Sequence, residues 1–189
     1  MRTPLVFAAL VLAAAPAAAQ RGAALPIELG VDAGVSRDDR ADVTTFAFPI
    51  SRVRAGFFLS PALSLEPTLG VMRMSGDGGS VTRSQGALGV VAHLAGVPTG
   101  RARTASFFVR PFVGFERTSV DFDENDGLFD DATTSATQAF AGAGAGFKLP
   151  VGDRLAWRIE GVFTRFVESD DLPDGSAFGL NVGLSFHTR

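Results

Sequence analysis

The sequence predicts an all-β protein, an eight-stranded antiparallel transmembrane β-barrel with an up-and-down meander. Eight runs alternate apolar residues with polar or small ones, and a period of two is typical of strands because successive side chains point to opposite faces. The connections alternate between mostly tight turns and longer loops, as in membrane barrels. The chain also has only one lysine, Lys148, beside 17 phenylalanines and 22 glycines, whereas the exterior of a soluble barrel is normally dense in Lys and Glu.

The N-terminus indicates export. Arg2 is followed by a short apolar run over residues 4–15 and by the small residues Ala17–Ala19, which is the pattern of a signal peptide cleaved before Gln20. The run is too short for a transmembrane helix, which needs about 20 apolar residues. We therefore expect a cleaved signal peptide over residues 1–19 and one outer-membrane β-barrel domain over residues 20–189.

Composition excludes several other classes. The formal net charge of −3 and the lack of a basic run argue against nucleic-acid binding. The absence of cysteine excludes a disulfide scaffold, a thiolate metal site, a cysteine nucleophile and a lipoprotein anchor.

The first four strands are expected over Ile27–Val35, Val43–Phe58, Leu63–Met74 and Ser84–Val97. In the second run the apolar phase slips after Ser51-Arg52, which predicts a β-bulge near Ser51. The glycine-rich stretch Ser75–Val81 is expected to be a loop.

The last four strands are expected over Ser106–Glu116, Thr137–Leu149, Leu155–Phe166 and Ala177–Phe186. The Ala/Gly alternation of the second of these predicts a strand, because its glycines would destabilise a helix. Arg117–Ser135 is expected to be the longest connection, and Pro150–Asp153 a turn.

The charged residues assign the two faces. An arginine on the lipid face near the midplane costs about 2–4 kcal/mol, so Arg110 and Arg158 are expected to face the lumen. The lumenal ion pairs and hydrogen bonds are expected to involve Glu66, Arg110, Gln138, Lys148, Arg158 and Glu160. Trp157, Phe163, Phe178 and Phe186 should then contact lipid.

Residues 20–189 resemble the small outer-membrane β-barrel family of OmpA-like and OmpX-like domains. The resemblance is carried by SFFVRPFVGFE, LAWRIEGVFTRF and the final FGLNVGLSF. It implies a location in the outer membrane, contact with membrane lipid, and recognition by the assembly machinery through the C-terminal strand. Two features depart from the family, since His187 and two more residues follow Phe186, and tyrosine is absent.

Three prolines conflict with this assignment. Pro49, Pro67 and Pro111 fall inside expected strands, where each removes a backbone donor, and a closed barrel has no free edge to accommodate the loss.

The sequence offers little chemistry, and we expect no catalytic, cofactor-binding or metal site. His93 is expected in the lumen and His187 beyond the last strand, without a Ser and an acid beside either. The segment starting at Asp121 resembles a calcium loop, but its glycine is seventh and Ala132 replaces the bidentate glutamate.

A non-enzymatic structural or surface-interaction role is therefore expected, for a monomer whose lumen is filled by side chains. The alternatives are an outer-membrane lipid-modifying enzyme and a narrow channel or carrier for small solutes. The third and fourth long loops follow the expected fifth and seventh strands, and their acidic residues are expected to meet an unknown extracellular partner: Asp121, Asp123, Glu124, Asp126, Asp130, Asp131, Glu168, Asp170, Asp171 and Asp174.

Overall fold

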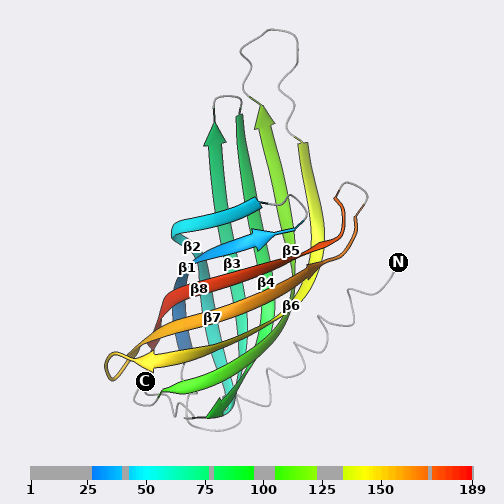
Figure 1. The fold of residues 1–189 in the computed structure, drawn as a ribbon. Helices are drawn as coiled ribbons and strands as arrows, with labels where there is room; N and C mark the ends of the chain where they lie inside the picture. The colour runs from blue at the N-terminus through cyan, green and yellow to red at the C-terminus, as the bar shows by residue number, and fades with distance from the viewer. Residues whose placement is uncertain are drawn as a thin grey trace.

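The computed structural model is a closed barrel, and it describes residues 27–39, 43–76, 79–95, 105–122, 134–169 and 172–188. The expected signal peptide lies outside these residues. The strands are β1 (Ile27–Asp38), β2 (Val43–Ser60), β3 (Leu63–Gly76), β4 (Gly79–Ala95), β5 (Ser106–Phe122), β6 (Thr134–Pro150), β7 (Leu155–Phe166) and β8 (Gly175–His187) (Figure 1).

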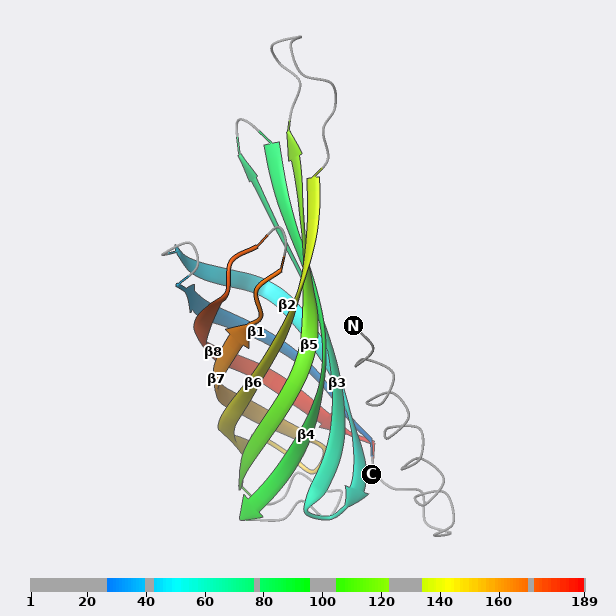
Figure 2. The same ribbon diagram turned by 90° about the vertical axis from the view of Figure 1, so that its right-hand side faces the viewer.

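Each strand pairs antiparallel with the next, and β8 pairs with β1 from Glu28–His187 to Asp38–Ala177. The eight-stranded meander predicted from the sequence is therefore confirmed. One end of the barrel carries the β2–β3 and β6–β7 turns, and we call it the turn end; the opposite end is the loop end. At the loop end β3 to β6 rise beyond the other strands (Figure 2). The described residues contain no helix that is both long and apolar enough to cross a bilayer.

The two faces follow the alternation of the sequence. Arg110 and Arg158 are each 1% exposed, whereas Phe178 is 65% exposed on the outer surface. The other three residues expected to contact lipid, Trp157, Phe163 and Phe186, also point outward. The large apolar side chains thus cover the outside of the barrel, and the polar core lies in its lumen.

The strand irregularity expected near Ser51 is present. Asp32 pairs with Arg52, but Gly34 pairs with Ala47, so residues 48–51 lie opposite a single residue of β1. Pro49 lies within this irregular segment. Its missing N–H therefore falls where the ladder to β1 is already interrupted.

The other two prolines lie at gaps in one ladder each. Between β2 and β3 the register passes from Arg54–Thr68 to Phe57–Leu65, which omits Glu66 and Pro67. Between β4 and β5 it passes from Gly89–Phe112 to Ala92–Val109, which omits Arg110 and Pro111. Both prolines keep their place in the ladder on the other side. The barrel thus tolerates each proline by leaving out two residue pairs.

Several connections are shorter in the structure than the sequence predicts. Most of the predicted loop Ser75–Val81 belongs to strands, because β3 runs to Gly76 and β4 begins at Gly79. The predicted connection Arg117–Ser135 is also shortened at both ends, because β5 continues to Phe122 and β6 starts at Thr134. These polar residues alternate weakly, so their extension as strands depends on pairing with neighbours that are already in register.

The expected position of His187 was wrong. His187 is the last residue of β8, pairs with Glu28 of β1, and is 1% exposed. The backbone N–H of His187 also donates to the carbonyl of Arg154 at 2.8 Å. The final strand therefore extends one residue past Phe186, and its alternation turns His187 into the lumen.

Candidate functional site: the barrel lumen

Charged side chains fill the middle of the lumen, and they form one connected set of ion pairs. We call this set the central charge cluster. Its members are Glu28, Asp32, Arg52, Arg54, Glu66, Arg110, Lys148, Arg158 and Glu160.

Arg158 joins the two carboxylates at the centre of the cluster. Its Nη1 donates to Oε2 of Glu66 at 2.5 Å and its Nη2 to Oε1 at 3.1 Å, while Nη2 also lies 3.2 Å from Oε2 of Glu160. On the other side Nε of Arg110 donates to Oε1 of Glu160 at 2.7 Å. Arg52 donates to Oε2 of Glu160 at 3.2 Å. Each central carboxylate therefore faces several cations, which offsets the cost of its burial.

Arg54 connects the centre to the turn end. Its Nη1 donates to Glu28 at 2.6 Å and its Nε to Asp32 at 3.1 Å. Its Nη2 donates to the Ser185 hydroxyl at 2.6 Å. Lys148 donates to the second oxygen of Glu28 at 2.5 Å. Arg54 thus has acceptors on β1 and β8, so it links the two strands whose pairing closes the barrel.

Glycines on neighbouring strands make room for these side chains. An added Cβ at Gly144 would lie 2.3 Å from a carboxylate oxygen of Glu160. A Cβ at Gly30 would lie 2.2 Å from the guanidinium carbon of Arg54. Large inward side chains therefore lie flat over inward glycines, which explains why glycine and charge share the lumenal face.

Most of the expected lumenal set is found in the cluster. Its predicted members are Glu66, Arg110, Lys148, Arg158 and Glu160. Gln138 lies apart near the loop end, where its Nε2 donates to the Pro173 carbonyl at 2.8 Å. Four members come from β1 and β2 and were not predicted. Alternation within these strands indicates an inward direction for Glu28, Asp32 and Arg54, whereas Arg52 lies where the phase of β2 slips. The four are Glu28, Asp32, Arg52 and Arg54.

An aromatic layer lies on the turn-end side of the cluster. Phe58 stacks on His93 with ring centroids 5.6 Å apart, and its ring also lies 6.3 Å from that of His187. Phe108 is fully buried, with the guanidinium of Arg158 4.3 Å from its ring centroid. His93 is lumenal, as expected, and Phe58 separates the two histidines.

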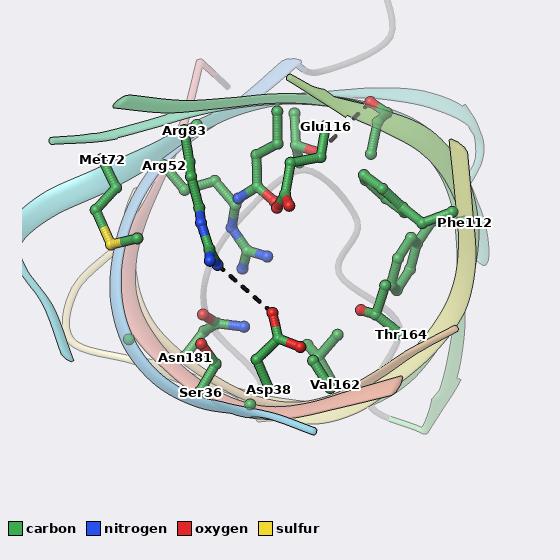
Figure 3. A pocket seen from close by; sticks show the side chains of 18 of the residues that line it. Ser36, Asp38, Arg52, Met72, Arg83, Phe112, Glu116, Val162, Thr164 and Asn181 are labelled. Carbon is green, nitrogen blue, oxygen red and sulfur yellow. Dashed lines mark hydrogen bonds and ion pairs between the residues drawn. The ribbon is translucent and has the colours of Figure 1, made fainter. Parts of the chain in front are cut away.

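A cavity of about 170 Å³ lies on the loop-end side of the cluster, and we call it the vestibule (Figure 3). Phe112, Phe140 and Phe166 form one wall, with successive ring centroids 6.1 and 5.8 Å apart. Arg52 and Arg110 of the cluster also line the vestibule. The carboxylate of Asp38 accepts from Nη1 of Arg83 across it at 3.5 Å. All eight strands contribute to its lining.

The two lumenal histidines have few polar contacts among the described residues. Neither ring nitrogen of His93 has a hydrogen-bond partner there, and Nδ1 of His187 has none either. The described residues also hold no cluster of three His, Asp or Glu side chains suited to a metal ion. The calcium-loop candidate starts at Asp121, which lies in β5, and its residues 123–132 are outside the described part of the chain.

A closed eight-stranded barrel with an apolar exterior and a charged lumen has the architecture of transmembrane barrel proteins. The chain belongs to the outer membrane protein beta-barrel domain family, whose model matches residues 5–186. This agrees with the resemblance seen in the sequence. No curated protein matches the chain by sequence.

Solved structures share the fold at low sequence identity. Neisserial surface protein A (NspA) is 10% identical, with a TM-score of 0.57, over 85% of this chain and 95% of its own. Ail of Yersinia pestis, in complex with the heparin analogue sucrose octasulfate, is 10% identical, with a TM-score of 0.51, over 86% and 96%. A major outer membrane protein from Thermus thermophilus is 12% identical, with a TM-score of 0.51, over 85% and 99%.

Proposed function

We propose that this chain is an integral outer-membrane protein with a structural or surface-interaction role, and that its lumen is a closed plug rather than a path for solutes. The observation that carries this proposal is the central charge cluster. Its cations and carboxylates reach across the lumen from β1, β2, β3, β5, β6 and β7. Moving a solute through the barrel would require several of these buried pairs to separate, at a cost of several kcal/mol.

Conductance in planar lipid bilayers tests the plug. We expect no steady single-channel conductance from the purified barrel, because Arg158 and Arg110 remain paired with Glu66 and Glu160. A steady conductance that is lost in Arg110→Ala or Glu160→Ala would show instead that these charges form an ion path, and the protein would then be a narrow channel.

The role we propose is non-enzymatic. His93 stacks on Phe58, and within the described residues its ring nitrogens have no hydrogen-bonded acid or hydroxyl. Incubation with purified outer-membrane lipid, followed by mass spectrometry, should show no turnover. Turnover that disappears in His93→Ala would assign the chain to the lipid-modifying enzymes.

The proposal also includes export, membrane assembly and a surface contact. Removal of residues 1–19, a monomeric barrel, and recognition of the C-terminal strand by the assembly machinery are all part of it. Outer-membrane fractionation with boiled and unboiled gel samples tests export and membrane assembly, since a folded barrel migrates differently before boiling. A pull-down with a peptide of residues 121–131 tests for a partner of the acidic third loop.

A further inference from the structure

The vestibule has an aromatic wall and a polar wall. Phe112, Phe140 and Phe166 come from β5, β6 and β7, and each ring is only 6–7% exposed. Arg83 of β4 and Asp38 of β1 also line the cavity and meet within the lumen, with the Phe112 ring to one side of them (Figure 3). A ligand in this space would contact apolar carbon on one side and a guanidinium on the other.

The cavity is maintained by glycines in the aromatic wall. A Cβ on Gly142 would lie 2.4 Å from Cζ of Phe112, and a Cβ on Gly114 would lie 2.6 Å from Cζ of Phe140. The two rings therefore lie back against neighbouring strands instead of projecting into the lumen. The remaining volume of about 170 Å³ is close to that of an engineered cavity of about 150 Å³ that binds benzene. One six-membered ring fits this space.

Arg83 has donor capacity that the described residues do not use. Its Nη1 lies 3.5 Å from the Asp38 carboxylate, at the long limit of a hydrogen bond. Its Nε is buried and has no hydrogen-bond partner within the described residues. Since a guanidinium presents its donors in a planar fork that matches a carboxylate, an anionic ligand would satisfy Nε and an Nη together.

We propose that the vestibule is a binding site for a small aromatic carboxylate, whose ring packs on Phe112, Phe140 and Phe166 and whose carboxylate binds Arg83. The central charge cluster closes the vestibule toward the turn end, so the ligand enters and leaves by the loop end. The site thus binds without transport, which goes beyond the structural role proposed above.

Phenylacetate is a suitable probe, with the full chain refolded into lipid nanodiscs. Methyl NMR of Ala87 and Ala177 reports on the site, because both residues pack against the aromatic wall. We expect saturable shifts of these two methyl signals with phenylacetate. Toluene lacks the carboxylate and acetate lacks the ring, so each should bind at least tenfold more weakly. Absence of saturable shifts with phenylacetate, or equal affinity for toluene, would overturn the proposal.

Two substitutions test the two walls. Arg83→Gln should weaken phenylacetate binding at least tenfold, whereas Arg165→Gln should change it less than twofold, because Arg165 pairs with Asp174 on the exposed rim. Ala177→Leu should fill the cavity and abolish the shift of the Ala87 methyl. The gel-mobility shift shows that each variant is folded. Unchanged binding in folded Arg83→Gln, or stronger binding of benzylamine than of phenylacetate, would refute the assignment.

Discussion

Glu66 of β3 and Arg158 of β7 meet across the lumen through two hydrogen bonds, although 92 residues separate them in the chain. Neither residue belongs to a strand adjacent to the other, so the pair joins opposite walls of the barrel. Both side chains are 1% exposed, which gives their interaction little screening by water. The pair therefore connects opposite walls of the barrel and lies at the centre of the plug that we propose.

Replacing Arg158 with methionine should destabilise the barrel by about 3–5 kcal/mol, because it leaves Glu66 buried with fewer cations around it. The matched change Arg165→Met removes an arginine from β7 that pairs with Asp174 at an exposed site, and it should cost less than about 1 kcal/mol. Urea unfolding in lipid vesicles measures both free energies. Equal losses of unfolding free energy in the two variants would mean that the lumenal pair stabilises the barrel no more than an exposed ion pair does.

The glycines of β6 make a second prediction. Gly142→Ala should destabilise the barrel by about 1–3 kcal/mol, because the new methyl would overlap the Phe112 ring and lie 2.3 Å from the Phe163 carbonyl oxygen. Gly161→Ala is the control, since the nearest atom to its added Cβ is 3.9 Å away. It should be neutral or stabilising by up to about 1 kcal/mol, as alanine loses less backbone entropy than glycine. The same unfolding experiment ranks the variants, and the reverse order would contradict the packing described.

Much of the fold could be predicted from the sequence because alternation is a local signal. Arg110 and Arg158 indicate which face of their strands points inward, because either charge on the lipid-facing surface would cost free energy. Strand ends were less predictable. Beyond Phe186 or before Ser84 the alternation is weak, so the lengths of β8 and β4 depend on pairing with β1 and β3 rather than on local pattern.

The partners of the lumenal charges could not be predicted in the same way. Inward phase identifies Glu66 as lumenal, but its pairing with Arg158 depends on the tilt and stagger of strands across the barrel. The irregular segment opposite Ala33 adds to this difficulty, because it changes the register of β2 with β1. Sequence periodicity predicts whether a side chain faces the lumen or the outside. Its partner across the lumen can be identified only from the closed barrel.

The single lysine allows a chemical test of the proposed plug. Lys148 is 3% exposed and bonded to Glu28, so an amine-reactive acetylating reagent should leave it unmodified in the folded protein and modify it after unfolding. Arg165→Lys supplies a control lysine at an exposed position and should be acetylated in the folded state. Mass spectrometry of the peptides distinguishes the two sites. Rapid acetylation of Lys148 in the folded barrel would show that solvent and reagent reach the cluster.

Arginine substitutions on the outer face test whether that face contacts lipid. Leu180 is 48% exposed in the middle of β8, and Leu149 is 43% exposed next to the β6–β7 turn. In a bilayer Leu180→Arg should cost about 2–4 kcal/mol, because it places a charge near the midplane, and Leu149→Arg should cost about 0–1 kcal/mol near the interface.

The comparison of these two variants separates a membrane barrel from a soluble one. On a water-exposed surface both changes would stay within about 0.5 kcal/mol of the original protein, because neither leucine fills the lumen. A depth-dependent penalty is a property of lipid alone, so unfolding free energies measured in vesicles decide the matter. Equal and small costs would mean that the apolar face does not contact lipid. A lipid penalty could then not explain why Arg110 and Arg158 face the lumen.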